Sequence, residues 1–460
     1  MNLSRRTLLG AGAAFLTLPA TLRAAETVDV VIAGGGLAGL YAARLLAGEG
    51  AKVVVLEGAA DVGGRLKTLT HLPGSPEAGG QTIDAMYARV LRTISDVGLS
   101  TIPRVAAVPG DTVIAAGKAM SVAAWGTSDA NRLTGAARGL PPGQLYSHYL
   151  DAANPVPELA DWRAATFAAL DREGVERLLA RAGAEPEALR LMQHWFDGGP
   201  MPEMSALFAC RKRLVEQFGA KAFYRVKGGS QGLPQAMAAS LGDAVRTGSR
   251  VVSIAQDRAG VEMRTAEGGR FRGRFGLVAL PFPALRKVEL GQGVPPGLGR
   301  AIRELPYSRI VLVTLALKRR FWEDDGLPPA MFVDGWVQRV TATPGQDGEL
   351  HSLSVWLRGE VPDLSDAALG QAVIDELARL RPATRDALAL ADVTRWDASA
   401  ESGGAYHYFG PGQIAALFDG MRQPWGRVRF AGEHLADMQQ GMEGACEAAE
   451  REALALLADL

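Results

Sequence analysis

Residues 28–39 read VDVVIAGGGLAG, and this stretch decides the fold. Its first half is a short β-branched apolar run, which is typical of a parallel strand buried on both faces. Its second half carries three spaced glycines, and a helical pattern follows from 40 to 48. A second buried strand, at 52–57, ends in Glu57. The order strand, glycine turn, helix, strand predicts one βαβ unit.

The glycine spacing Gly34-x-Gly36-x-x-Gly39 indicates a ligand for this unit. The first glycine permits the tight turn, the second lets backbone N–H groups approach a pyrophosphate, and the third lets helix and strand pack closely. The pyrophosphate then lies at the positive end of the helix dipole. Glu57 is placed to accept hydrogen bonds from ribose hydroxyls, and its charge would repel a 2′-phosphate. The unit therefore predicts a dinucleotide site that disfavours NADP, against the alternative of a glycine turn without a ligand.

The composition is that of an ordinary globular protein. Of 460 residues, 48% are hydrophobic and 22% are charged, which argues against a disordered or collagen-like chain. Lys and Arg number 49 and Asp and Glu 50, so no overall charge attracts nucleic acid or anionic lipid. Cys210 and Cys446 cannot form a disulfide framework, and no His or Cys spacing matches a metal site. We expect both cysteines to be buried as small apolar residues.

Residues 1–25 are typical of a targeting signal rather than of a folded segment. Arg5 and Arg6 precede an apolar run from 8 to 18, which is too short for the about 20 residues that a membrane-spanning helix needs. This pattern predicts a twin-arginine signal peptide cut near Ala25; the alternative is a disordered tail with a chance Arg pair. The twin-arginine translocase carries folded proteins. We therefore expect a periplasmic protein that receives its cofactor before export.

The rest of the chain predicts two interleaved domains. Patterns typical of strands occur at 251–254, 276–280, 310–317, 331–340, 353–357 and 428–431, and patterns typical of helices at 366–380 and 442–457. We expect an α/β fold. A Rossmann-like domain with a parallel sheet, formed by 26–84, 226–290 and 391–460, binds the dinucleotide. It is interleaved with an α+β domain for the substrate, formed by 85–225, which is mostly helical, and 291–390, which supplies a mixed sheet.

Further glycine-rich motifs follow along the chain. Residues 61–65 read DVGGR, 78–82 AGGQT, 227–234 KGGSQGLP, 402–406 SGGAY, 430–434 FAGEH and 441–445 GMEGA. Together with the first glycine turn and Glu57, these motifs resemble the flavin amine oxidase family, which includes monoamine, polyamine and L-amino-acid oxidases. The resemblance extends over most of the chain after the signal. It implies FAD-dependent oxidation of an amine or an L-amino acid.

The resemblance also implies which residues contact FAD. It places Arg65 near the phosphates, Glu433 at the ribityl chain, and the helix that begins at Met442 with its positive end at the flavin pyrimidine edge. The other implied contacts are Gly34, Gly36, Gly39, Glu57, Gly64, Gly80, Gln81, Val251 and Gly432. Ala405 stands where some relatives have a cysteine attached to the flavin. We therefore expect non-covalent FAD.

Three side chains are candidates for catalysis: Lys287, Tyr406 and Trp396. The resemblance places Lys287 at a water beside flavin N5, where it would assist flavin reoxidation or imine hydrolysis; the neighbouring Arg286 leaves the register open by one, and a surface lysine is the alternative. Tyr406 would form one wall of an aromatic cage around the amine. Many relatives have a second aromatic wall, but Gly441 stands at that position. The pocket is therefore wider there, or is walled from elsewhere, with Trp396 the candidate.

The substrate and the partners stay open at the level of the sequence. Arg89 is a candidate to pair with a substrate carboxylate, and a surface helix charge is the alternative. We expect a small-molecule amine or amino acid to give an imine, which water hydrolyses, with electrons passing to O₂ or a periplasmic acceptor. The alternatives are a flavin desaturase or porphyrinogen-type oxidase, and a flavin-bound redox partner without turnover. Neither nucleic acid nor a metal is expected, and the oligomeric state, a homodimer included, is open.

Overall fold

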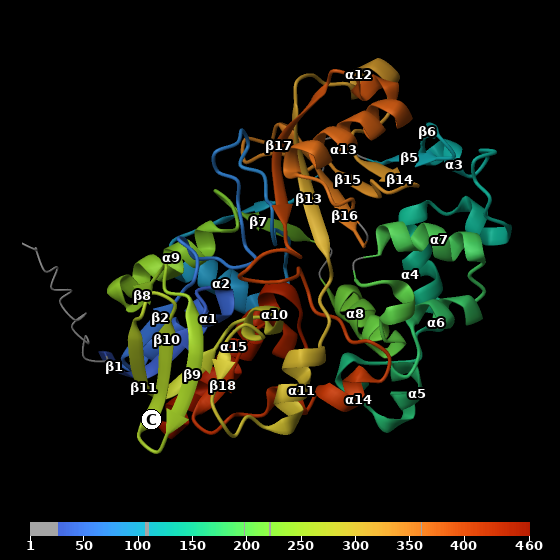
Figure 1. Ribbon diagram of the computed structural model, residues 1–460. Coiled ribbons are helices and arrows are strands. Elements are labelled where there is room, and N and C mark those ends of the chain that lie inside the picture. Colours follow the sequence, from blue (N-terminus) through green and yellow to red (C-terminus); the bar gives the residue numbers. More distant parts are fainter. Residues whose placement is uncertain (1–25, 106–109, 197, 220–221, 360) are drawn as a thin grey trace, which may run out of the picture.

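The computed structural model describes residues 26–105, 110–196, 198–219, 222–359 and 361–460 (Figure 1). The predicted signal peptide lies outside the described residues. The α-helices are α1 (Leu37–Gly48), α2 (Ala88–Asp96), α3 (Val122–Trp125), α4 (Pro142–Ala153), α5 (Ala168–Asp171), α6 (Val175–Arg181), α7 (Pro186–Trp195), α8 (Ala206–Phe218), α9 (Gly232–Leu241), α10 (Phe282–Leu285), α11 (Pro296–Glu304), α12 (Trp322–Asp325), α13 (Asp366–Leu380), α14 (Gln413–Leu417) and α15 (Gly441–Asp459). Within the described ranges, no helix is both long and apolar enough to cross a membrane.

The first of two large sheets is built around β1 (Glu26–Ala33). Its other strands are β2 (Val53–Leu56), β8 (Val245–Arg246), β9 (Val251–Asp257), β10 (Gly260–Thr265), β11 (Arg270–Val278), β12 (Glu289–Leu290) and β18 (Val428–Phe430). The order is β12-β9-β10-β11-β1-β2-β8, and β18 pairs with β11. β1 runs parallel to β2 and β11, whereas β10 is antiparallel to both of its neighbours. The predicted α/β fold with a parallel-containing sheet is confirmed.

β1 is continuously apolar near its end because both of its faces are buried. Val30 and Ile32 belong to the core that also contains residues of α1 and α15. Val31 and Ala33 belong to the core on the opposite face. All four side chains are fully buried, and burying a Val or Ile side chain contributes about 1.5–3 kcal/mol. The glycine turn that follows β1 is therefore anchored to a rigid strand.

The second sheet is mixed and lies above the first in Figure 1. Its strands are β5 (Thr112–Ala115), β6 (Lys118–Ser121), β13 (Ile310–Leu317), β14 (Met331–Val333), β15 (Arg339–Thr341), β16 (Ser352–Arg358) and β17 (Leu388–Arg395). The order is β17-β13-β16-β15-β14-β5-β6. The β14–β5 pair is parallel and the other pairs are antiparallel. Helix α13 covers one face, where Leu369, Val373 and Leu377 join the core of this sheet.

The structure contains strands that the sequence-based prediction did not place, β8, β10 and β12 of the first sheet among them, and it also differs from the prediction in the second sheet. The segment 85–225 is mostly helical, but it also supplies β5 and β6 to the second sheet. The single strand predicted at 331–340 is two strands, because the chain turns between them and Gln338 adopts a positive φ of 58°. Strand β17 was not predicted: most of its residues are half-buried rather than alternately buried and exposed, so it lacks the two-residue period that indicates a strand.

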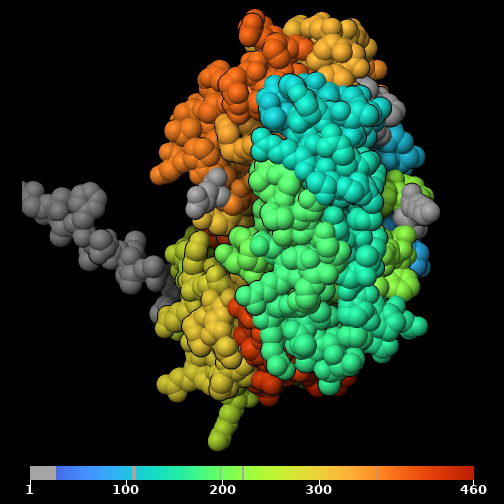
Figure 2. All heavy atoms as spheres, turned by 90° about the vertical axis from the view of Figure 1, so that its right-hand side faces the viewer, coloured from blue at the N-terminus to red at the C-terminus, as the bar shows by residue number. Residues whose placement is uncertain are grey.

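A small sheet connects the two halves of the molecule. It consists of β3 (Ile83–Asp84), β7 (Phe223–Val226) and β4 (Thr101–Pro103), in the order β3-β7-β4. The helices from α3 to α8 cover the side of the molecule that faces the viewer in Figure 2, in cyan to green. The strands of the first sheet come from the segments predicted for the dinucleotide domain. The domain boundaries themselves stay a prediction.

Candidate active site

An elongated cavity of about 580 Å³ opens at the carboxyl ends of the parallel strands. Gly34 after β1, Glu57 after β2, Ala279 after β11 and Gly432 after β18 all line it. Ligands of open α/β sheets bind at this edge of the strands. The cavity continues to β15 and β16 of the second sheet, so it lies between the two halves of the molecule.

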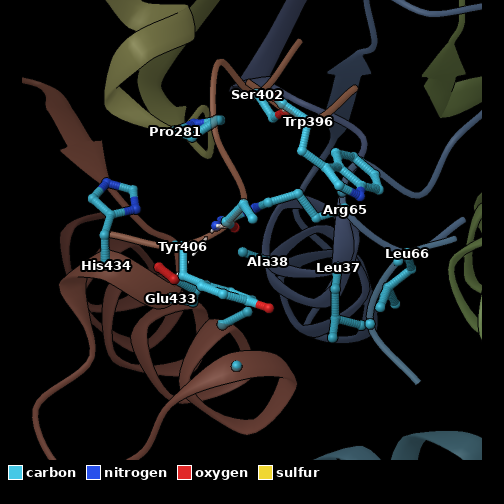
Figure 3. Close-up of a pocket in the computed structure, with 18 of the residues that line it drawn as sticks. Leu37, Ala38, Arg65, Leu66, Pro281, Trp396, Ser402, Tyr406, Glu433 and His434 are labelled. Atoms are coloured by element: carbon cyan, nitrogen blue, oxygen red, sulfur yellow. Dashed lines mark hydrogen bonds and ion pairs between the residues drawn. The ribbon is translucent and has the colours of Figure 1, made fainter. Parts of the chain in front are cut away.

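The glycines after β1 are required by close backbone contacts. A Cβ on Gly39 would lie 2.0 Å from the carbonyl oxygen of Gly34, and Gly34 itself has φ +107°. Helix α1 therefore crosses directly against the turn. Gly36 is its N-cap, and Leu37 and Ala38 line the cavity (Figure 3). The first N–H groups of a helix have no partner within it, so this end of α1 offers the cavity an anion site.

Two hydrogen bonds from backbone N–H groups hold the side chain of Glu57 at the glycine turn after β1. Its carboxylate accepts hydrogen bonds from Gly35 N at 2.7 Å and from Ala59 N at 2.8 Å. Burial raises the pKa of Glu57, and the two hydrogen bonds oppose that effect. The carboxylate is thus fixed at the cavity wall beside the glycine turn, at the end of the second strand where the sequence predicted it.

Glu433 connects three of the predicted motifs. Its carboxylate lies 3.4 Å from Arg65 Nη1 and 3.0 Å from His407 Nδ1, and Arg65 also donates to the carbonyl oxygen of Ala405 at 2.8 Å (Figure 3). Burial alone would raise the pKa of Glu433, but His407 and Arg65 outweigh it and the pKa lies well below its usual range. Glu433 is therefore an anion held by two partners. Sequence reasoning missed His407, because nothing local links it to Glu433.

His434 follows Glu433 and is also buried. Its ring lies 4.4 Å from the ring of Phe282, centre to centre, and neither ring nitrogen has a hydrogen-bond partner among the described residues. Burial lowers the pKa of His434 to about 3, with Glu433 opposing and His407 adding to the effect. His434 is therefore neutral at ordinary pH.

An aromatic group lies where the cavity meets the second sheet. Trp396 is buried and donates its Nε1–H to the carbonyl oxygen of Ala78 at 2.8 Å. Tyr406 and Trp356 pack against the cluster that contains Trp396, and all three line the cavity. Figure 3 shows Tyr406 and Trp396 from the same loop region close to Arg65. Trp356 comes from β16 and was not singled out in the sequence.

The side chain beside Gly441 is Tyr87. A Cβ on Gly441, which has φ +56°, would lie 3.7 Å from the Tyr87 hydroxyl oxygen. Tyr87 lines the cavity, and burial raises its pKa to about 12, so the hydroxyl keeps its proton. The structure thus adds an aromatic ring beside Gly441, from the turn before α2, to Trp396, the candidate wall from the sequence, which lines the same cavity.

The start of α15 is held at the cavity by two charged side chains. Arg211, which is buried, donates to the carbonyl oxygens of Asp437 and Gln439, each at 2.9 Å. The carboxylate of Glu447 accepts the N–H groups of the same two residues at 2.8 and 2.7 Å. Met442, in the first turn of the helix, lines the cavity. The positive end of α15 is thus fixed toward the cavity.

Lys287 and Arg286 point to different places. The Arg286 guanidinium donates to the carbonyl oxygens of Ile302 and Leu305, both at 2.6 Å. Lys287 lines the cavity with an exposed side chain, and it has no ion-pair partner among the described residues. Of the two basic residues, Lys287 is therefore the one that faces the cavity.

Arg89 is placed away from the cavity. Its guanidinium pairs with Glu443 at 3.2 Å and Glu450 at 2.7 Å, both on α15, and it is not among the described cavity residues. Glu443 also accepts the backbone N–H of Val90, so the pair fastens α2 to α15. The prediction that Arg89 contacts a substrate is thus corrected: its neighbours give it a structural role.

The remaining predicted cofactor residues meet in the cavity. The described residues that line it include Gly64, Gly80, Gln81 and Val251. The two cysteines are buried and unpaired, as expected. In the described part of the chain, no three His, Cys, Asp or Glu side chains gather as a metal site requires. Two helix N-termini, a glycine cradle and a fixed carboxylate in one long cavity fit a flavin dinucleotide.

Comparison with known proteins identifies the family. The model of the family described as flavin containing amine oxidoreductase matches residues 37–457. The chain is 26% identical to the flavin-containing amine oxidase B of Homo sapiens (93% of this chain, 86% of that one) and 25% identical to the flavin-containing amine oxidase of Danio rerio (93% and 85%). Its fold matches putrescine oxidase bound to putrescine (TM-score 0.79, 22% identity, 94% and 100% covered) and cyclohexylamine oxidase from Brevibacterium oxydans (0.77, 22%, 94% and 99%). The chain belongs to the flavin-containing amine oxidoreductases and is a flavin-dependent amine oxidase.

Proposed function

We propose that this chain oxidises a small primary or secondary amine, or an amino acid, to the imine, with FAD bound non-covalently in the cavity. The observation that carries the proposal is the continuity of this cavity. It joins the glycine cradle at Gly34 and Gly36 to the aromatic group of Trp356, Trp396 and Tyr406. A dinucleotide lying along it brings its reactive ring toward these aromatic side chains.

The reaction removes two electrons from the substrate. Bound FAD supplies the acceptor for the hydride that leaves the carbon next to nitrogen. Loss of that hydride and of one proton from nitrogen leaves a C=N bond, and water then gives the carbonyl compound and ammonia or a smaller amine. The rings of Tyr406 and Trp396 flank the amine and exclude water from the reacting carbon.

The chain stabilises the negative charge that develops as the electrons arrive. The N-terminus of α15 presents its unpaired N–H groups and the positive end of its dipole. Because Arg211 and Glu447 hold the preceding loop, this positive end is fixed before the charge appears. Lys287 holds a water in the cavity for imine hydrolysis or for reoxidation by O₂, which then yields H₂O₂, or by a periplasmic acceptor.

The support for non-covalent attachment is Ala405, whose methyl group cannot form a thioether. Acid precipitation of the purified yellow protein should release all of the FAD into solution. Flavin that stays with the pellet would contradict this part of the proposal.

Export by the twin-arginine route to the periplasm is part of the same proposal. Its support is the Arg5-Arg6 pattern before a short apolar run. Replacing both arginines with lysine should leave the flavoprotein in the cytoplasm, whereas unchanged export would refute the route.

The decisive experiment mixes the flavoprotein anaerobically with amines, amino acids, lipophilic alkenes and porphyrinogens. Bleaching of the flavin band by amines or amino acids supports the proposal. Bleaching only by alkenes or porphyrinogens identifies a desaturase or porphyrinogen-type oxidase, and no bleaching identifies a redox partner without turnover.

A further inference from the structure

The part of the cavity formed by the second sheet and the helical segment is rich in cations. Arg104, Lys212, Arg339 and Arg358 line it, and they come from four elements: the end of β4, α8, β15 and the end of β16. Among the described lining residues of segments 85–225 and 291–390, Glu216 is the one acid. An amine with a second ammonium group at its far end would be repelled here.

Two of these cations adjoin the aromatic group. Arg358 Cζ lies 5.9 Å from the centre of the Trp356 ring, and Arg339 is paired with Trp356 across β15 and β16. Trp356 in turn packs against the cluster of Trp396 with Tyr406. The guanidinium groups therefore lie about one aromatic side chain farther along the cavity than Tyr406 and Trp396, between which the reacting amine is proposed to bind.

Arg339 is held in a fixed orientation. Its guanidinium lies 4.1 Å from the centre of the Trp195 ring, a stacking contact that orients a planar cation. Asp111, which does not line the cavity, is a described acid whose charge acts on Arg339. A planar guanidinium is a donor whose geometry suits a carboxylate.

Arg104 is crowded by like charges. Burial lowers its pKa, and the charges of Arg339 and Arg225 lower it further. Its Nε is buried without a hydrogen-bond partner among the described residues. Arg225, by contrast, donates to the carbonyl oxygen of Pro344 at 2.7 Å and is not a described cavity residue. An anion bound at Arg104 would relieve both the repulsion and the unmade hydrogen bond.

We propose that Arg104, Arg339 and Arg358, the cationic arm, bind an anionic group at the far end of the substrate. The substrate class is then an amine with a carboxylate remote from the reacting nitrogen. The inference rests on the proposed amine oxidation. It differs from recognition of an α-carboxylate, which would need a cation beside the reacting carbon.

A matched set of substrates tests the arm. 5-Aminopentanoate, pentylamine and 1,5-diaminopentane share one carbon chain and end in a carboxylate, a methyl group and an ammonium. We expect kcat/KM to fall in that order, with the optimum length found among the 4-, 5- and 6-carbon amino acids. A preference for the diamine or for pentylamine at every length overturns the arm. Preference for L-norvaline, whose carboxylate adjoins the amine, also overturns it.

Variants assign the effect to the arm. Arg339→Gln and, separately, Arg104→Gln should lower the ratio of kcat/KM for 5-aminopentanoate to that for pentylamine about tenfold or more, through KM. Arg339→Lys should restore part of the ratio, because the charge stays and the planar fork is lost. The control is Arg92→Gln, an exposed position on α2, which should leave the ratio unchanged. An unchanged ratio in both arm variants overturns the inference.

Binding without turnover separates the arm from the chemistry. Glutarate, which has no amine, should bind the flavoprotein in calorimetry more weakly as salt rises and more weakly in Arg339→Gln. Glutarate binding without oxidation of any amine would support the anion site and refute the proposed function. Amine oxidation without glutarate binding or carboxylate preference would refute the arm and leave the proposed function standing.

Discussion

His434 predicts a specific dependence of stability on pH. The pKa of an unfolded histidine is about 6.5, whereas burial lowers that of His434 to about 3 in the native state. Between these two values the unfolded chain binds a proton that the native protein does not. The stability contributed by the neutral ring is therefore complete above pH 6.5 and is lost as the pH falls toward 3.

The magnitude follows from the size of the shift. One pKa unit corresponds to about 1.4 kcal/mol, so lowering the pH from 7.5 to 5 should remove about 2 kcal/mol of the free energy of unfolding through this one residue. Neither ring nitrogen has a partner among the described residues, so no hydrogen bond offsets the cost of protonation. The ring packs against Phe282 at 4.4 Å.

The assay compares urea unfolding of three proteins at the two pH values. His434→Gln should lose about 2 kcal/mol less than the wild type between pH 7.5 and pH 5. His148→Gln, at an exposed histidine on α4, is the matched control and should behave as the wild type does. If His434→Gln and the wild type lose the same stability, the inferred pKa of His434 is wrong.

Three further substitutions test the site. Gly39→Ala places a methyl 2.0 Å from Gly34 O, so stability should fall by about 1–3 kcal/mol with loss of FAD; full flavin absorbance and an unchanged melting temperature would contradict the close packing. Lys287→Met should keep FAD bound but slow reoxidation or turnover in stopped-flow measurements, and an unchanged steady-state rate would remove Lys287 from the mechanism. Tyr87→Leu removes the ring beside Gly441 and should raise KM for amines roughly fivefold, about 1 kcal/mol; an unchanged KM would place the wall elsewhere.

Local sequence patterns predicted those helices and strands whose sequence signals lie within the element or directly beside it. The strand, glycine turn and helix at 28–48 became β1 and α1, because the turn glycines and the two-sided burial are encoded side by side. The helix predicted at 366–380 has those bounds in the structure. The predicted strand at 331–340 failed at the turn between β14 and β15, although Asp334-Gly335 marks that break in the sequence.

Contacts between distant segments could not be predicted from such patterns. Tyr87 meets Gly441 only because α2 packs on α15, and no local spacing carries that information. The same holds for His407 at Glu433. Arg89 is a case in which proximity in the sequence misled. It lies close to a predicted cofactor motif along the chain, but in the structure its guanidinium pairs with Glu450 and Glu443. No argument from composition or periodicity reveals these two partners.

The pairing of β1 with β11, and of β11 with β18, sets an order of events during biosynthesis. Strand β1 emerges from the ribosome long before β11, and β18 and α15 follow later still. Such high contact order slows folding and prevents the dinucleotide half from forming co-translationally. Cofactor loading must therefore wait for the nearly finished polypeptide, and a route that exports only folded protein would come after that step.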